Sequence, residues 1–564
     1  MRKKLLAVLL CTGMLLAACG NSESGTGNES ETAPTATKDN LENTETSADS
    51  SSIVDYDNHL DDTSNEIFNG EFKYSGDNPS GIENDGSKYT IQAAGEYTLS
   101  GTLSEGQIVV EAGAEDEVVI NLSNTQISCS NDAPIKILSA GQVKIKAVEG
   151  TYNRVTDARA AKISEDSEND SETDSENGIC GSAIYATCDL SVAGKGTLIV
   201  DGGYNNGIHT KNDLKIKNVT LRVESYGKCL KGNDSVEIES GNFSLVSDSG
   251  DGIKTTNNDI SDKGNQKGNI TIYDGTIEIQ ASQDAIDAVN DVNVEGGKIT
   301  IACKKDGIHG DNIVNITGGE IQVNESGEGI EGNQVVVNGG KTYVYATDDG
   351  VNASSGSATP LVQINGGYLE VKTASGDTDG IDSNGSYEQT GGFVLVRSGS
   401  MMGNMAGSVD VNGNVTVTGG SIVALGGICE LPSNSCNVYG SSTLNLEKGN
   451  YSLKNSKDEE LFGFAIEETY NSFWICSDVL TTGEDYVLKN GTTEIAAWNQ
   501  EEGITGEVTS GFGGRGGFGG TQGGGKPGRP EEFGGNQEGE KPGKPEEFGG
   551  NQGGERPTGM EKPY

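Results

Sequence analysis

A short acidic turn that recurs at nearly constant spacing constrains this chain more than any other feature of its sequence. The turn reads acid, glycine, aliphatic, and its copies begin at Asp306, Glu328, Asp349 and Asp379. The first three glycines are 22 and 21 residues apart, and a variant with alanine for glycine, starting at Asp284, lies 22 residues earlier. A repeat of this length holds about three short alternating strands and no helix-length apolar stripe. The pattern predicts an all-β fold, a three-sided parallel β-helix with one repeat of about 22 residues in each coil.

Gly-Gly pairs and changes in composition predict the domain boundaries. A Gly-Gly pair precedes one strand of most repeats, as at 296–297 and 318–319, and we place the β-helix at residues 66–424. Residues 425–500 are richer in aromatic side chains and predict a small C-terminal β cap or module, because an open solenoid end exposes an unpaired strand edge. Residues 501–564 contain two copies of a Pro-, Gly- and charge-rich 15-residue unit and predict a disordered tail. Acidic or polar insertions are expected near 163–177 and 257–268.

The amino terminus has the features of an export signal. Residues 1–18 combine a basic start with a short apolar run that is too short to span a bilayer. The run ends in Leu-Ala-Ala-Cys and resembles the lipobox of bacterial lipoproteins, which implies cleavage before Cys19 and lipidation of that cysteine. Residues 19–65 are polar and predict a disordered tether. We therefore expect the protein on the extracellular face of the cell membrane, held there only by the lipid.

The charge balance narrows the range of partners. The chain has 85 acidic against 39 basic residues, a net charge of −46, which argues against binding to nucleic acid or to an anionic membrane surface. Ten cysteines form no C-x-x-C pair and only three histidines are present, so a zinc site is not expected. Cysteines of the exported part form disulfides, with Cys429 and Cys436 the closest in sequence, or fill the core as free thiols. The sequence leaves these two alternatives open.

The acidic turns predict cation sites. If the aliphatic residue of each turn points inward, the neighbouring acids stack about 4.8 Å apart, and two carboxylates at that distance repel by about 3 kcal/mol. Calcium binds carboxylate and carbonyl oxygens in flexible geometry and fits between acids of adjacent coils. The alternative is an ordinary solvated turn, because Asp-Gly is a common turn dipeptide. The predicted calcium ligands are Asp251, Asp284, Asp287, Asp306, Glu328, Glu331, Asp349, Asp379 and Asp382.

Four sequence blocks carry a family resemblance. Residues 95–110, 149–157, 204–216 and 249–256 resemble a bacterial carbohydrate-binding β-helix family, and the resemblance covers about residues 85–425. It implies a right-handed parallel β-helix of the pectate-lyase type, bound calcium, and cellulose-like or acidic plant polysaccharides as ligands. Cys229-Leu230-Lys231 departs from the Gly-Ile pattern, so no metal site is expected on that coil.

The function predicted from these features is non-catalytic binding of polysaccharide by a surface-anchored protein. Tyr343, Tyr345, Tyr368 and Tyr387 are the candidate residues for stacking on sugars, with packing within the solenoid as the alternative. A calcium-dependent polysaccharide lyase is the second hypothesis, with Lys254, Lys304 or Lys305 as the base. A structural or adhesive surface protein is the third. The sequence does not specify the glycan or the number of ions.

Overall fold

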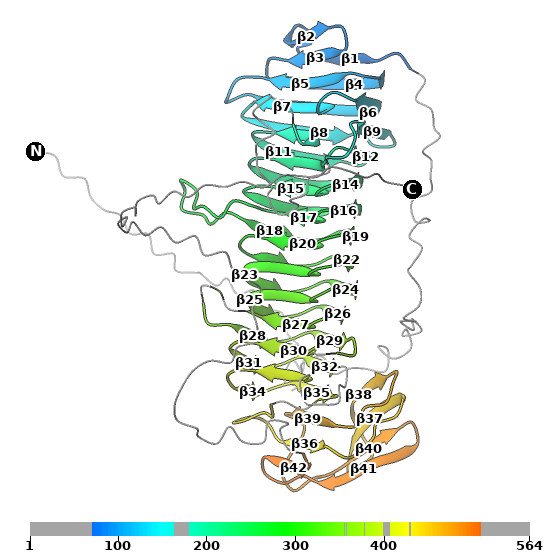
Figure 1. The fold of residues 1–564 in the computed structure, drawn as a ribbon, viewed down its shortest axis with the longest axis vertical. Coiled ribbons are helices and arrows are strands. Elements are labelled where there is room, and N and C mark those ends of the chain that lie inside the picture. The colour runs from blue at the N-terminus through cyan, green and yellow to red at the C-terminus, as the bar shows by residue number, and fades with distance from the viewer. Residues whose placement is uncertain are drawn as a thin grey trace, which may run out of the picture. The chain divides into compact units, whose positions relative to one another are not determined.

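Stacked β-coils make up most of the described chain. The computed structural model describes residues 70–162, 180–398 apart from 355, 357 and 377, 407–427, and 430–508. Within these ranges the chain forms a β-solenoid of about 12 turns and no α-helix, which confirms the predicted fold class. Figure 1 shows successive coils lying on one another. No helix in these ranges is long and apolar enough to cross a membrane.

Three parallel sheets form the sides of the solenoid, and each coil contributes one strand segment to each sheet. The strands that follow the acidic turns form sheet 1. Its members are β3 (Lys88–Ile91), β5 (Gln107–Glu111), β7 (Ile135–Ser139), β10 (Ser182–Ala186), β13 (Asn206–Thr210), β15 (Leu230–Gly232), β17 (Ile253–Lys254), β20 (Ile286–Ala288), the first parts of β23 (Ile308–Ile316) and β25 (Ile330–Val337), β27 (Val351–Ala353), β30 (Ile381–Ser383) and β33 (Val409–Val411).

Sheets 2 and 3 follow sheet 1 within every coil. Sheet 2 contains β4 (Gly95–Leu103), β6 (Glu117–Cys129), β8 (Gln142–Ala147), β11 (Asp189–Gly194), β14 (Asp213–Ser225), β16 (Ser235–Ser247), β18 (Asn269–Ile272), β21 (Val292–Val294), the second parts of β23 and β25, β28 (Leu361–Ile364), β31 (Ser386–Gln389) and β34 (Val415–Val417). Sheet 3 contains the second parts of β4, β6, β14 and β16 with β9 (Tyr152–Asp157), β12 (Thr197–Gly202), β19 (Thr276–Ala281), β22 (Lys298–Cys303), β24 (Glu320–Glu325), β26 (Lys341–Ala346), β29 (Tyr368–Thr373), β32 (Phe393–Arg397) and β35 (Ser421–Leu425).

Aliphatic side chains from equivalent positions of the coils stack to form the core. In sheet 1 the aliphatic residue of each acidic turn pairs with its counterpart on the next coil, so that Ile286, Ile308 and Ile330 form one inward column. All three are fully buried, and Val351 and Ile381 continue the column. Because the residue directly after an inward residue must face away from the core, and the acidic turn ends directly before the inward residue, this column fixes the positions of the turn acids.

The Gly-Gly pairs form the corner between sheets 2 and 3. The second glycine of each pair has a positive φ, as at Gly319 with φ +87°. A Cβ atom there would lie 2.9 Å from the carbonyl oxygen of Gly297 on the preceding coil. Glycine is therefore required both for the backbone conformation and for the close approach of neighbouring coils.

Antiparallel strands close both ends of the solenoid. At the start, β1 (Lys73–Gly76) pairs with β4, and β2 (Ile82–Asp85), preceded by the 3₁₀ turn η3 (Pro79–Gly81), forms a hairpin with β3. At the other end, β39 (Phe473–Ser477) pairs antiparallel with β35 and so covers the last edge of sheet 3. β36 (Val438–Ser441) pairs with β39 and with β42 (Ile504–Glu507).

A four-stranded antiparallel sheet completes the C-terminal module. It has the order β38 (Glu460–Ile466), β37 (Gly449–Asn455), β40 (Asp485–Asn490), β41 (Thr493–Asn499). Its aromatic side chains form a second core with Phe393, Leu395, Val423 and Leu425 of the last coils. The predicted start of the tail at residue 501 is wrong, because β42 belongs to this module.

Several sequence predictions lie outside the described residues. These are the signal at 1–18, Cys19, the tether at 19–65, the acidic insertion at 163–177 and the tail after residue 508. Seven cysteines are described and all are free thiols, whereas Cys429 lies outside the described ranges. The insertion at 257–268 is described and forms a loop closed by a bridge between Ile260 and Gln266.

Candidate metal-binding sites

The nine predicted calcium ligands gather into three groups of three acids, each built from two adjacent coils. Triad 1 is Asp251, Asp284 and Asp287; triad 2 is Asp306, Glu328 and Glu331; triad 3 is Asp349, Asp379 and Asp382. Within each triad, one carboxylate oxygen from every residue lies within 4.8 Å of the others. The acids therefore form three separate clusters along the edge of sheet 1 instead of one continuous row.

The strand register explains this grouping. The first row consists of the residues two positions before the inward aliphatic side chain, and the second row of the residues directly after it. The first row is acidic on every coil from Asp251 to Asp379. The second row reads Lys254, Asp287, His309, Glu331, Asn352 and Asp382 in register, so acids alternate with other residues. Each triad takes one first-row acid from its lower coil and both acids from its upper coil.

Backbone amides of the next coil occupy one oxygen of several first-row carboxylates. Asp284 Oδ1 accepts a hydrogen bond of 2.8 Å from the amide of Asp306. Asp349 Oδ1 accepts one of 2.8 Å from the amide of Asp379, and Asp379 Oδ1 accepts one of 2.6 Å from Gly407. Because a carboxylate has two oxygens, one can orient the turn while the other faces the triad. The same acids thus join neighbouring coils and leave a ligand atom for an ion.

Burial distinguishes these acids from ordinary solvated turn residues. Asp251, Asp284 and Asp287 are 6–8% exposed and Asp379 is 1% exposed. Burial raises the pKa of Asp379 to about 8. Burial, with the charge of Glu331, raises the pKa of Glu328 to about 8, and burial with the charges of Asp284 and Glu331 raises that of Asp306 to about 7. These raised pKa values mean that the protein alone provides too few positive charges and hydrogen-bond donors to stabilise the ionised acids.

The residues of triad 3 fit a calcium ion. All three acids offer oxygen, the donor that calcium prefers. Asn352, in register between Glu331 and Asp382, donates its side-chain amide to Glu328 Oε2 at 2.9 Å. Its carbonyl oxygen Oδ1 is buried and has no hydrogen-bond partner. A buried amide oxygen without a donor is costly unless something positive contacts it, and a calcium ion in triad 3 would do so.

Charged side chains from the second row already contact the other two triads. The ammonium of Lys254 forms an ion pair with Asp287 and lies 4.0 Å from Asp251 Oδ2. His309 lies between two acids, with Nδ1 3.3 Å from Asp287 Oδ1 and Nε2 3.7 Å from Glu331 Oε2. Burial opposes protonation of His309, but the hydrogen bond that its ring donates to Asp287 and the charges of the surrounding acids outweigh burial and raise the pKa of His309 to about 9.

The stability of the metal-free protein is expected to fall as pH rises from 6 to 9. Asp306, Glu328, Asp379 and His309 all have folded-state pKa values above their ordinary ones, so the folded chain holds more protons than the unfolded chain in this window. The protonation that stabilises the fold is lost as pH passes through 7–9. We expect the free energy of unfolding, measured with urea in the presence of EDTA, to fall by at least about 2 kcal/mol. With calcium present, the fall in stability with rising pH should vanish or reverse, because a bound metal ion displaces these protons. A metal-free stability that rises with pH would contradict this description.

The four candidate tyrosines have different environments. Tyr387 is fully buried, and its hydroxyl donates to Gln389 Oε1 at 2.8 Å, so its prediction as a sugar-binding residue is wrong. Tyr368 is half-buried, stacks on Phe393 with ring centroids 5.7 Å apart, and packs against the core of the C-terminal module. Tyr343 and Tyr345 lie half-buried on the outer surface of β26. These two are the candidates that remain accessible to a ligand.

Lys254, a candidate base of the lyase hypothesis, is unsuited to that role. A general base must be uncharged, but the charges of Asp287 and Asp251 outweigh the effect of burial and raise the pKa of Lys254. Its ammonium is also held by the ion pair with Asp287. Lys304 and Lys305 adjoin triad 2 on the turn that carries Asp306.

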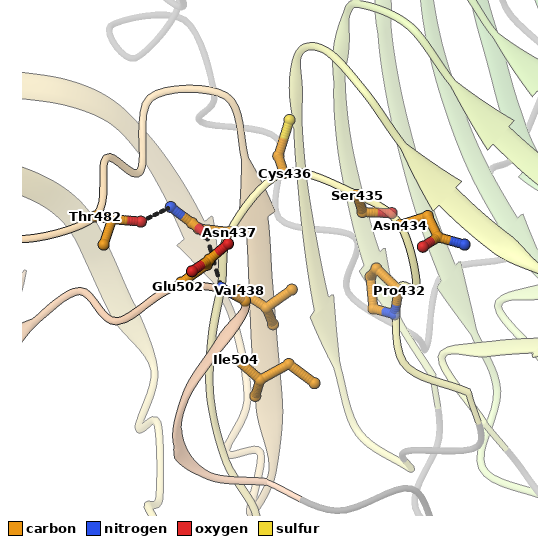
Figure 2. Close-up of a pocket in the computed structure, with 10 residues that line it drawn as sticks. Pro432, Asn434, Ser435, Cys436, Asn437, Val438, Thr482, Glu502 and Ile504 are labelled. Atoms are coloured by element: carbon orange, nitrogen blue, oxygen red, sulfur yellow. Dashed lines mark hydrogen bonds between the residues drawn. The ribbon is translucent and has the colours of Figure 1, made fainter.

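A pocket of about 630 Å³ lies in the C-terminal part, away in sequence from the triads. Figure 2 shows it between the segment Pro432 to Val438 and Thr482, Glu502 and Ile504, with Asn437 hydrogen-bonded to Thr482. None of the predicted site residues lines this pocket. It therefore has no part in the cation sites described above.

Comparison with known proteins identifies the family. The family model described as carbohydrate-binding domain-containing protein matches residues 85–374 and 299–459, which together span most of the solenoid. The chain belongs to this family. A carbohydrate-binding domain-containing protein of Acetivibrio thermocellus is 31% identical over 222 residues, covering 39% of this chain and 73% of the relative.

The chain is also similar to a solved structure. It is the polysaccharide lyase-like protein from C. thermocellum, as a gadolinium derivative, with 34% identity, covering 43% of this chain and 91% of that chain at a TM-score of 0.37. Membership of the carbohydrate-binding family supports a carbohydrate-binding role for this chain.

Sequence reasoning missed three residues that contact the triads. Asn352 and His309 have no predicted role, and Lys254 is predicted only as a candidate base. The signal that identifies them is position: all three directly follow the inward aliphatic residue on the lower coil of a triad. The acids alone do not reveal this, because they repeat on every coil.

Proposed function

We propose that this member of the carbohydrate-binding family is a calcium-stabilised, non-catalytic polysaccharide-binding protein, anchored on the outer face of the cell membrane by a lipid on Cys19. The observation that carries the calcium proposal is the formation of three acid triads from adjacent coils, with an unpaired buried oxygen on Asn352, a residue in register with Asp382 of triad 3. The lipobox-like sequence before Cys19 supports the anchor. Family membership supports the polysaccharide.

Calcium has a structural role in this proposal. Each triad joins two coils, and an ion bound to both holds the turns before sheet 1 at a fixed distance. The outer surface of sheet 3 ends at these turns, with Tyr345 four residues before Asp349. A tyrosine ring and polar side chains on a flat, regularly spaced strand surface suit an extended glycan. Bound calcium would keep that surface rigid and reduce the entropy cost of ligand binding.

A sedimentation assay tests this function. The full chain is mixed with microcrystalline cellulose or with immobilised polygalacturonate, with calcium or with EDTA, and the bound fraction is measured. We expect retention on at least one polysaccharide in calcium and at least about tenfold weaker binding in EDTA. Tyr345→Ala should weaken retention with little change in stability, and Tyr152→Ala, an exposed tyrosine on an early coil, is the matched control.

Two outcomes would contradict the proposal. Absence of retention on every polysaccharide tested would favour a structural or adhesive role instead. Release of unsaturated sugar products, followed by their absorbance, would show that the protein is a lyase and that its description as non-catalytic is wrong.

A further inference from the structure

The three triads place carboxylates at equivalent positions, three aspartates in triads 1 and 3 and one aspartate with two glutamates in triad 2, but they differ in a fourth side chain. On the lower coil of each triad, the residue after the inward aliphatic side chain is Lys254 in triad 1, His309 in triad 2 and Asn352 in triad 3. The three sites therefore carry an ammonium, an imidazole and a neutral amide at one equivalent position. The residue at this position determines which side chain can offset the negative charge of each triad.

Triad 1 is the most buried of the three and contains a cation from the chain itself. Its three acids are all buried, and Lys254 contacts Asp287 directly and lies 4.0 Å from Asp251. The lysine side chain is only 25% exposed, so its charge faces the acids and not the solvent. An ammonium in that position neutralises part of the charge that would otherwise attract a divalent ion.

The preceding coils keep Lys254 directed toward the acids. Lys231 lies in register with Lys254 on the coil before it and is buried. Lys228, two positions before the inward Leu230, is the first-row residue of that coil. A side-chain rotation of Lys254 away from triad 1 along the row would place it beside these like charges, which is unfavourable. The acids of triad 1 are the nearest favourable partners.

Triad 3 is the opposite case. No positively charged residue follows Val351; Asn352 is there, with its amide hydrogens directed to Glu328 and its carbonyl oxygen buried without a partner. The position in register with the second-row acid thus has a neutral amide in triad 3 and an ammonium in triad 1. Calcium requires oxygen ligands and is repelled by an ammonium within its coordination shell.

We propose that Lys254 is the resident cation of triad 1, so that calcium occupies triads 2 and 3 and not triad 1. His309, at the equivalent position in triad 2, forms its hydrogen bond with Asp287 of triad 1 and lies 3.7 Å from Glu331 of triad 2, so the imidazole also lies nearer to triad 1. The inference rests on the proposed function in that it assumes calcium at the other triads. It goes beyond that function by assigning different occupants to sites whose carboxylates lie at equivalent positions. Because this cation is tethered to the chain, it has a high effective concentration at the acids, and calcium must displace it to enter triad 1.

Counting bound ions tests this assignment. The full chain is stripped with EDTA, exchanged into calcium-free buffer and titrated with calcium chloride by isothermal calorimetry. The wild type is expected to bind two ions, and Lys254→Asn, which places the residue of triad 3 at the same position in triad 1, is expected to bind three. The third ion should bind more weakly than the other two, because Asp287 Oδ1 remains hydrogen-bonded to His309 in this variant.

Matched variants assign the extra ion. Lys298→Asn removes a lysine whose side chain is 64% exposed on sheet 3 and should leave two ions. Adding Asp251→Asn to Lys254→Asn should return the count from three to two. Lys254→Gln serves as the second variant if Lys254→Asn does not fold, and far-ultraviolet circular dichroism with a thermal melt shows whether each variant is folded.

The number of calcium ions bound by the wild type and the change in that number on substitution of Lys254 test two different statements. Three ions in the wild type, or no gain in either folded Lys254 variant, would overturn the assignment of Lys254. If the wild type binds no calcium but Lys254→Asn binds one ion, Lys254 does exclude calcium from triad 1. The proposal that the native protein binds calcium is then wrong. A wild type and variants that all bind no calcium would overturn both.

Discussion

Calcium added to the full chain after removal of divalent ions is expected to raise its melting temperature by about 5–10 °C. Each ion that binds only the folded state contributes about 2.7 kcal/mol at a hundred times its dissociation constant. Two ions therefore contribute about 5 kcal/mol. The entropy of unfolding is roughly 2 cal/mol/K per residue, which is about 0.9 kcal/mol/K for a domain of this size. Dividing the stabilisation of about 5 kcal/mol by this entropy gives a shift in melting temperature within the stated range.

Magnesium and a double variant provide the controls for this prediction. Magnesium demands shorter, near-octahedral coordination and gives up water reluctantly, so the same concentration should raise the melting temperature much less. Asp349→Asn with Asp379→Asn removes two acids of triad 3, and we expect it to lose about half of the calcium-dependent shift. A melting temperature that is the same in calcium and in EDTA would show that the triads do not bind the ion in the folded protein.

Tyr387→Ala is expected to lower the free energy of unfolding by about 3–5 kcal/mol. The tyrosine is fully buried inside the solenoid, in register with Val362 on one coil and Val415 on the next. Truncation leaves a cavity that the rigid coils on either side do not fill. It also removes the hydroxyl that donates to Gln389, whose amide in turn donates to carbonyl oxygens of Gly391 and Ser421.

Urea unfolding at constant calcium measures this loss, and two variants separate its causes. Tyr387→Phe keeps the ring and removes the hydrogen bond, so about 1 kcal/mol should be lost. Tyr345→Ala, from the outer surface of β26, should cost less than the buried truncation and should weaken polysaccharide binding instead. If Tyr387→Ala were as stable as the wild type but bound polysaccharide poorly, Tyr387 would be a ligand-contacting residue after all.

The repeat made the position of the acids predictable. In a parallel β-helix with coils of nearly constant length, residues one repeat apart lie side by side, and Ile286, Ile308 and Ile330 do so in the structure. Once that column points inward, the acids before and after it have only one edge of sheet 1 to occupy. Local sequence and global fold agree here, which is why both the fold class and the gathering of the acids follow from the pattern.

The division of the acids into triads required the register of the second row. The first row alone predicts a continuous line of carboxylates, and only the alternation of Lys254, Asp287, His309 and Glu331 separates it into clusters. That alternation is present in the sequence but is easily overlooked, because lysine, histidine and asparagine are common turn residues. Burial of the acids was also unpredictable, since it depends on packing between coils.

Two other errors have physical causes. Tyr387 occupies a position where neighbouring coils have valine, and a polar aromatic residue gives no sequence signal of burial. The strand at Ile504–Glu507 is short and contains glycine, so by composition it belongs with the tail that follows. It is a strand only because β36 supplies a partner from residues more than sixty positions earlier.

Anomalous diffraction from crystals of the full chain grown with calcium tests the central claim most directly. We expect one peak among the carboxylates of Asp349, Asp379 and Asp382 with Asn352 Oδ1 as a further ligand, at calcium–oxygen distances of about 2.3–2.6 Å. A second peak is expected in triad 2, and triad 1 should contain the ammonium of Lys254. Crystals at millimolar calcium with no peak in any triad would contradict the account.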